Sequence, residues 1–167
     1  MKKILALLVI VMALPVFAAS PKIGYVDLQK AIQKTTAGKK AKKQLEKEFA
    51  KRKKDLKKME DDLQKMTKDF DKKVMVLSDE VRQKKRRALD GEMLKYRQKV
   101  GKNQIEIQKK ERDLISPIIT KLRKIVGKIA QKEGYTVILE KSGQSVLWAK
   151  DDINLTDRLI KEYEKNK

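Results

Sequence analysis

The chain has 167 residues and a net charge of +20, from 43 basic and 23 acidic side chains, which suggests one strongly basic domain. It contains no cysteine and no histidine, so disulfides, thiolate chemistry, Cys/His zinc sites and imidazole acid–base catalysis are excluded. The charge favours acidic partners, namely nucleic acid, anionic lipid or acidic polypeptide, and an aromatic content of 5% argues against a large compact core.

The first segment, 1–18, has the layout of a secretory signal peptide. Lys2 and Lys3 give it a positive start, an unbroken apolar run of 11 residues follows at 4–14, and short side chains lead to Ala18. A membrane anchor needs roughly 20 apolar residues, so we expect cleavage after Ala18 and export from the cytoplasm. Export argues against a nucleic-acid partner and against work driven by ATP, because both are scarce outside the cytoplasm.

Two segments at the ends of the mature chain, 19–36 and 132–167, are predicted to form one β-containing body. Runs that favour strands lie at 23–28, at 135–140, where apolar and polar side chains partly alternate, and at 145–149. The fold class is therefore predicted as α+β and mostly α.

Between these segments, residues 37–131 are predicted to form one long helical hairpin. They are rich in Lys, Glu, Gln, Leu and Met, which favour helices, and they hold 31 basic and 15 acidic residues. Mostly apolar residues recur at spacings of four and three, as in a coiled-coil seam. On the first helix these positions are Ala41, Leu45, Phe49, Arg52, Leu56, Met59, Leu63, Met66 and Phe70. On the second helix they are Arg86, Leu89, Met93, Tyr96, Val100, Asn103, Ile107, Lys110 and Leu114.

The two seams agree with each other in register. Antiparallel helices pair residues whose numbers have a constant sum, and the two series, taken in opposite directions, give sums of 155 or 156. This places the turn at 77–79, where Ser78 is a suitable N-cap for the second helix. The same pairing sets Arg52 opposite Asn103. We expect an arm of roughly 55–60 Å, at 1.5 Å per residue, whose apolar stripe is largely taken up by its own partner helix.

The free end of the arm is predicted to be its most basic part. Its cationic residues are Lys72, Lys73, Arg82, Lys84, Lys85, Arg86 and Arg87. Such a cluster is either a solvated helix face or a binding site for anionic groups of a partner. Two glycines interrupt the second helix of the arm. Gly91 and Gly101 each lower the stability of this helix by roughly 1 kcal/mol, so we also expect the arm to bend.

The last part of the chain completes the body. Ser142 and Gly143 favour a turn, and a final helix is expected with Asn154 as its cap. About 54 residues outside the arm bury too little apolar surface to be stable alone and leave sheet edges unpaired, so we expect an oligomer. The residues expected in the oligomeric body are Ile23, Tyr25, Val26, Val137, Leu139, Val146 and Trp148.

Several short motifs together resemble the Skp/OmpH family of periplasmic chaperones, across nearly the whole mature chain. They lie, in the family's order and spacing, at 23–28, 38–41, 45–49, 116–118, 134–139 and 152–156. The resemblance implies a homotrimer in which strands from three chains build a central body and three hairpins project around a cavity. It implies an ATP-independent holdase in the periplasm that binds unfolded outer-membrane proteins and prevents their aggregation. It also implies anionic lipid or lipopolysaccharide as possible ligands of the basic tip.

Three other function classes fit the sequence less well. A structural or tethering coiled-coil protein on an anionic lipid surface is the main alternative. Nucleic-acid binding is opposed by export and by the lack of base-stacking aromatic residues on the arm. An enzyme is least expected, because Asp151 and Asp152, the adjacent carboxylates of the body, favour a loop before a helix. We therefore predict no catalytic residues, no metal and no cofactor.

Overall fold

The computed structural model describes residues 20–141 and 146–165. The expected signal peptide at 1–18 and the turn at Ser142 and Gly143 lie outside the described residues. In chain order the elements are β1 (Ile23–Val26), α1 (Leu28–Lys34), α2 (Thr36–Lys73), α3 (Asp79–Glu133), β2 (Val137–Glu140), a 3-10 turn (Asp151–Ile153) and α4 (Thr156–Lys165). Within the described ranges, every helix is too short or too polar to cross a membrane.

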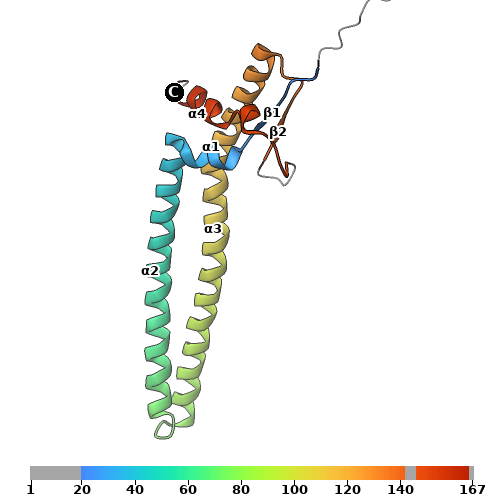
Figure 1. The fold of residues 1–167 in the computed structure, drawn as a ribbon. Coiled ribbons are helices and arrows are strands. Elements are labelled where there is room, and N and C mark those ends of the chain that lie inside the picture. Colours follow the sequence, from blue (N-terminus) through green and yellow to red (C-terminus); the bar gives the residue numbers. More distant parts are fainter. Residues whose placement is uncertain (1–19, 142–145, 166–167) are drawn as a thin grey trace, which may run out of the picture.

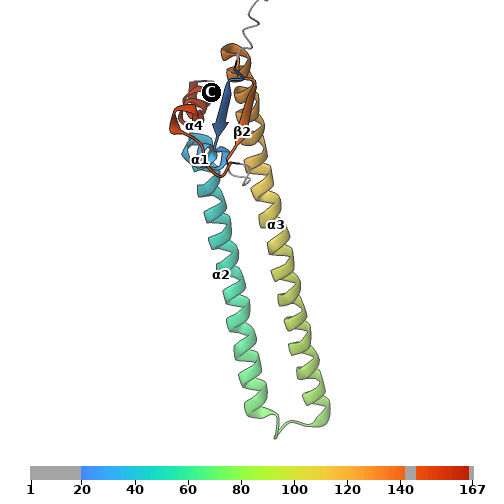
Figure 2. The same cartoon turned by 45° about the vertical axis from the view of Figure 1, so that its right-hand side comes forward.

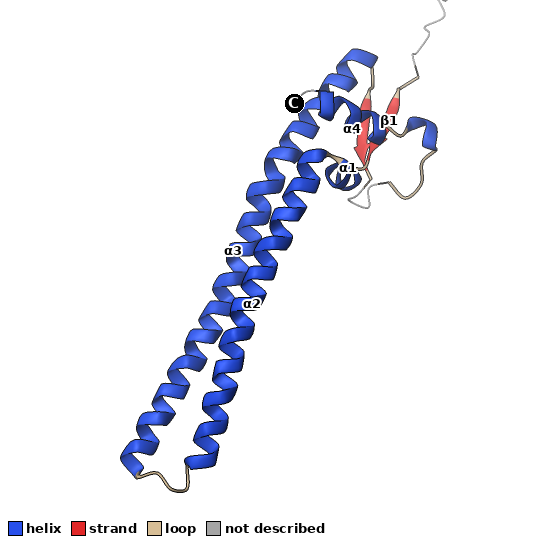
Figure 3. Cartoon of the chain, turned by 90° about the vertical axis from the view of Figure 1, so that its left-hand side faces the viewer, coloured by secondary structure: helices blue, strands red, loops and turns tan. Residues whose placement is uncertain are grey.

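The molecule consists of a long two-helix arm and a small body at one end of it (Figure 1). Helices α2 and α3 run antiparallel along the arm and join at the end farthest from the strands, and a turned view shows the same arrangement (Figure 2). Helix α2 has 38 residues and α3 has 55. The extra length of α3 carries it past the start of α2 and into the body, where it lies beside α1, α4 and the strands (Figure 3).

Strands β1 and β2 pair in parallel, with Ile23 opposite Val137 and Tyr25 opposite Leu139. Parallel strands need a long crossover connection, and here the whole arm supplies it. On its other side, β1 forms an isolated bridge from Tyr25 to Asn154, and Leu155 N donates to Tyr25 O at 2.8 Å. The segment just before α4 therefore occupies the second edge of β1.

The third strand expected at 145–149 is not formed. Ser145 lies outside the described residues, and 146–149 are loop. Because Asn154 and Leu155 already pair with β1, that edge is not open to 146–149 within this chain. Trp148, a residue expected in this strand and in the oligomeric body, is 80% exposed in the single chain.

The other predicted bounds are close to those observed, with local reasons for each difference. The first strand ends at Val26 instead of residue 28, because Asp27 caps α1 by accepting from Lys30 N at 2.7 Å. The second strand begins at Val137 instead of residue 135, after Gly134 ends α3 with a φ of 68° in the left-handed region. Asn154 does cover the start of α4, where its Oδ1 accepts from Thr156 N at 3.0 Å.

The core lies between the sheet, α1, α4 and the last turns of α3. Its buried members are Val26, Leu28, Ala31, Ala41, Ile118, Leu122, Ile125, Ile129, Leu155, Leu159 and Tyr163. Ile118 to Ile129 come from the part of α3 that extends beyond the arm, so this helix serves both parts of the molecule. A cation–π contact places Lys121 Nζ 4.3 Å from the centre of the Tyr163 ring and adds to the attachment of α4.

The junction between α1 and α2 attaches the arm to the body. Thr35 is fully buried and caps α2, with its Oγ1 accepting from Gly38 N at 3.2 Å. Glu164, from α4 at the far end of the chain, accepts hydrogen bonds from Thr36 N at 2.6 Å and from Thr36 Oγ1 at 3.0 Å. Both caps lie at the N-terminus of α2, where a carboxylate is also favoured by the helix dipole. The direction of the arm is thus fixed by residues from both ends of the chain.

The double substitution Gly91→Ala, Gly101→Ala is expected to stabilise the arm by about 1 kcal/mol per site, because alanine has the higher helix propensity. A Cβ at either position would meet no other atom within 4 Å, so no clash offsets this gain. The check is the urea midpoint together with amide exchange along 86–107. An unchanged midpoint and unchanged exchange would show that these glycines do not weaken the arm.

Candidate functional site

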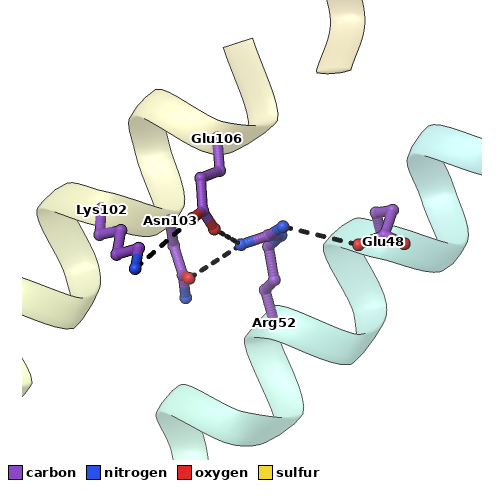
Figure 4. A network of polar contacts seen from close by, with 5 residues as sticks. All are labelled: Glu48, Arg52, Lys102, Asn103 and Glu106. Atoms are coloured by element: carbon purple, nitrogen blue, oxygen red, sulfur yellow. Dashed lines mark hydrogen bonds and ion pairs between the residues drawn. The ribbon is translucent and has the colours of Figure 1, made fainter. Parts of the chain in front are cut away.

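The predicted register of the arm is confirmed at its polar layer. Arg52 of α2 lies opposite Asn103 of α3, and Arg52 Nη1 donates to Asn103 Oδ1 at 3.1 Å (Figure 4). Ser78 lies at the N-cap position of α3, as the pairing also predicted, although its side chain makes no capping hydrogen bond. Its backbone oxygen accepts from Arg82 N at 2.9 Å.

Three more charged residues surround this layer. Arg52 Nη1 also pairs with the Glu106 carboxylate, and its Nη2 lies 3.7 Å from Glu48 Oε2. Lys102 Nζ lies 3.9 Å from Glu106 Oε1. Asn103 is only 5% exposed, and its Nδ2 has no hydrogen-bond partner among the described residues. A buried amide whose N–H donor lacks a partner lowers the stability of the folded arm. This layer therefore contributes more to the register of α2 against α3 than to the free energy of folding.

Glu106 makes the arm sensitive to acid. The hydrogen bond from Arg52 lowers the pKa of this carboxyl below that of an ordinary glutamate, against the opposing effect of desolvation. A carboxyl whose pKa is lowered in the folded state stabilises that state above its unfolded pKa, and the effect is lost as the pH falls through the folded pKa. We therefore expect Arg52→Met to show a weaker fall in stability below pH 4.5 than the unsubstituted chain, in urea denaturation at a series of pH values. Identical pH profiles would contradict this assignment.

The apolar stripe of the arm is less completely covered than its spacing suggested. Phe49 is 61% exposed, and Met66, Met93 and Val100 also keep large exposed fractions. On one side of the arm, α2 and α3 leave two neighbouring hollows of about 440 and 410 Å³, which share Glu60 and Tyr96 as lining residues. Sequence reasoning missed these hollows because the seam pattern identifies which residues face the partner helix but not how closely the helices approach.

The predicted basic tip is present at the free end of the arm. Lys72 and Lys73 end α2, and the other five residues lie in the first turns of α3. Two of the seven are tied to nearby carboxylates, Lys73 to Asp69 at 2.9 Å and Arg82 to Asp79 at 3.1 Å. Within the described chain, no ion pair engages the remaining five, which are Lys72, Lys84, Lys85, Arg86 and Arg87.

The turn at the tip also carries apolar side chains that the sequence reasoning did not single out. Met75 is 88% exposed and Val76 is 84% exposed. A signal was available, because the apolar run from 74 to 77 leads directly into the turn predicted at 77–79. The tip thus combines free cations with exposed apolar groups, a pairing that suits a partner with both anionic and apolar parts.

The seven residues expected in the oligomeric body divide into two groups. Tyr25 and Val26 are buried within the single chain, where the Tyr25 hydroxyl donates to Asp151 Oδ1 at 3.4 Å. The others are exposed or half-buried, and they are Ile23, Val137, Leu139, Val146 and Trp148. Four of these line a hollow of about 320 Å³ between the sheet and the loop before α4. The result is an apolar face left open on the body.

The carboxylates of the body were the remaining candidates for chemistry in the sequence. Among them, no group of three or more carboxylate side chains is arranged to hold a metal ion. Asp151 and Asp152 lie in the 3-10 turn, and Asp151 is engaged with Tyr25. The candidate site thus consists of two exposed surfaces, which are the basic tip of the arm and the open apolar face of the body.

Comparison with known proteins identifies a family and a similar fold. The family model described as "Outer membrane protein (OmpH-like)" matches residues 22–163. Among solved structures, the chain is similar to a candidate outer membrane chaperone (OmpH-like) from Caulobacter crescentus CB15, with a TM-score of 0.74 and 17% identity. The match covers 89% of this chain and 87% of that one, and at this identity it establishes the fold. No curated protein matches the chain.

Proposed function

Because this chain belongs to the OmpH-like family, we propose that it is an ATP-independent holdase chaperone that binds unfolded outer-membrane proteins and prevents their aggregation. The observation that carries the proposal is the arm, which combines a large excess of cations with partly exposed apolar side chains along its length and at its tip. The solved structure from Caulobacter crescentus, which bears the description of a chaperone, supports the same assignment.

The proposal includes a homotrimer in the periplasm, exported by a signal peptide that is cleaved after Ala18. The open apolar face of the body, with Ile23, Leu139 and Trp148, supports self-association, because a small domain with this much exposed apolar surface gains stability from covering it. Three arms projecting from such a body would surround a cavity in which one client is kept from pairing its strands with those of another.

Capture and release would follow from weak interactions. The basic arms would attract acidic clients over about 10 Å at moderate salt, and this attraction would speed encounter. Exposed apolar residues such as Phe49 and Met93 would add many small contacts, and methionine adapts to partners of different shape. Because no single contact is strong, the client could leave without ATP when folding into the membrane offers a lower free energy.

The proposal is tested by diluting a urea-unfolded outer-membrane β-barrel protein into buffer with and without the mature chain. We expect light scattering to stay low at about one oligomer per client, without ATP, and protection to weaken as salt is raised. Equal aggregation at low salt in the presence of folded, oligomeric chain would refute the holdase assignment.

The basic tip should contribute to client capture. Charge reversal at Lys84, Lys85, Arg86 and Arg87 is expected to weaken client binding about tenfold at low salt and to flatten its salt dependence. These residues lie on the exposed surface of α3, so the fold should tolerate the change, which circular dichroism would verify. Client affinity measured by fluorescence across a salt series is the readout. Unchanged affinity and an unchanged salt slope would remove the tip from the binding surface.

A second function is favoured by one specific observation. Met75 and Val76 project from the turn between free cations, an arrangement suited to inserting into an anionic membrane surface. We therefore keep tethering to anionic lipid or lipopolysaccharide as the alternative. It predicts sedimentation of the chain with vesicles rich in phosphatidylglycerol, loss of this binding in Met75→Ser, Val76→Ser, and no suppression of client aggregation.

A further inference from the structure

The two sides of the arm differ in chemistry. On one side, the two hollows between α2 and α3 follow one another along the arm and form what we call the arm groove. Its lining residues are Phe49, Arg52, Lys53, Leu56, Lys57, Glu60, Leu63, Gln64, Thr67, Lys68, Met93, Tyr96, Arg97, Val100, Asn103, Gln104 and Ile107. On the opposite side lies a smaller hollow of about 230 Å³, lined by Glu48, Arg52, Glu106, Ile107, Lys109, Lys110 and Asp113. The groove is thus largely apolar, whereas six of the seven residues that line the opposite hollow are charged.

The charges on the two sides also differ. The arm groove is lined by five cationic residues and by one acid, Glu60, which already pairs with Lys57 at 3.4 Å. Among the described residues no ion pair engages Lys53, Lys68 or Arg97, so these three cations remain available at its rim. The opposite hollow has three acids and three bases, and its central Arg52 is held by Glu48 and Glu106. The groove side therefore combines a mostly apolar floor with a net positive rim, whereas acidic and basic side chains balance in the opposite hollow.

The length of the groove indicates the kind of occupant. From Phe49 to Lys68 along α2 it spans about 29 Å at 1.5 Å per residue. An extended chain rises about 3.3 Å per residue, so about nine residues would fill it. A transmembrane β-strand has about 9–11 residues, with apolar and polar side chains in alternation. Laid along the groove, such a segment would turn its apolar side chains to the floor and its acidic ones to the cationic rim.

We propose that the arm groove, between Phe49 and Lys68 of α2 and the facing part of α3, binds one unfolded transmembrane-strand segment of a client in extended form, and that the opposite side of the arm does not. This inference rests on the proposed function, and it names the surface and the segment through which that function is exercised. Apolar contact on the floor supplies attraction that salt does not screen, while Lys53, Lys68 and Arg97 select for segments that carry acidic residues.

Site-specific photocrosslinking on the full mature chain tests the proposal. A benzoylphenylalanine would replace Gln64 or Gln104 in the groove, and Lys109 or Asp113 on the opposite side as matched positions. All four residues are exposed, so the probe should not disturb the seam. The client is a urea-unfolded eight-stranded outer-membrane protein, diluted into the chain before irradiation. We expect strong crosslinks to the client from Gln64 and Gln104 and weak ones from the matched positions, with the client-side sites in its strand segments.

A pair of charge variants gives an independent readout. Lys68→Glu with Arg97→Glu reverses two rim charges, and Lys109→Glu with Lys110→Glu makes the same change in net charge on the opposite side. The first pair is expected to raise the client Kd about tenfold more than the second, which corresponds to about 1.4 kcal/mol. Equal effects of the two pairs would mean that only the total charge of the arm matters, and this would overturn the proposal.

The crosslinking and aggregation results together distinguish failure of the groove proposal from failure of the holdase assignment. If the unsubstituted chain prevents aggregation while crosslinks form equally on both sides, the groove proposal fails and the holdase stands. Crosslinks from Gln64 to a second copy of the chain, or to lipid of added vesicles in preference to the client, would likewise overturn it. If the unsubstituted chain gives no protection, the holdase assignment and the groove proposal fail together.

Discussion

Replacing Gly38 with alanine is expected to destabilise the folded chain by about 2–3 kcal/mol. A Cβ at this position would lie 1.7 Å from the backbone oxygen of Ile32, a distance that only a shift of the backbone can relieve. The shift would also weaken the cap of α2, because Gly38 N donates to the buried Thr35 Oγ1. The close approach of α1 to the first turn of α2 is thus the reason for glycine at this position.

The control is the same substitution further along the arm. Gly91→Ala is expected to stabilise the chain slightly, since its Cβ would meet nothing within 4 Å. Urea denaturation of both variants, followed by circular dichroism, gives the comparison. Because the junction directs the arm, Gly38→Ala should also reduce protection of an unfolded client under conditions where the variant remains folded. If the two glycines responded alike to alanine, the junction would not have the packing described above.

The second large effect concerns the polar layer of the arm. Arg52→Met is expected to cost about 1–3 kcal/mol, because Asn103 Oδ1 would be buried without a partner. Adding Asn103→Leu should recover this loss and leave the double variant at least as stable as the parent, since the layer would then be apolar. The unpaired Asn103 Nδ2 of the parent supports this ranking of stabilities, because the leucine also removes an unsatisfied hydrogen-bond donor.

A double-mutant cycle in urea measures the coupling directly. We expect Arg52→Met alone to lower the free energy of unfolding strongly, and to lower it little when Asn103→Leu is already present. Charge is changed equally by Arg52→Met in both backgrounds, so a difference between them cannot come from net charge. Equal losses in the two backgrounds would show that Arg52 and Asn103 contribute independently, and that the layer does not select the pairing of the two helices.

The arm could be predicted from sequence because two independent patterns, the seam spacing and the turn residues, indicate the same structure. Two seams with the same spacing fix one antiparallel register, and a turn signal at Ser78 lies where that register requires it. The contact between Arg52 and Asn103 is the clearest confirmation. The basic tip was equally accessible, because a run of charged residues at a helical turn is exposed in any packing of the arm.

The body was harder to predict because its contacts join residues far apart in sequence. The pattern at 145–149 favoured a strand, yet the edge of β1 is taken by Asn154, which no local pattern indicated. Tyr25 and Val26, which were expected in the oligomeric body, are buried within the single chain by contacts that no local pattern indicates. The arm groove also escaped prediction, since it depends on the distance between two helices and not on which residues face each other.

In the proposed function, the arms of one oligomer hold one unfolded outer-membrane protein. Native mass spectrometry of the mature chain mixed with a urea-unfolded β-barrel client, without ATP, tests this most directly. We expect a complex with the mass of three chains and one client, which dissociates on addition of salt more readily than the oligomer itself. Free chain beside aggregated client, with no species containing both, would contradict it.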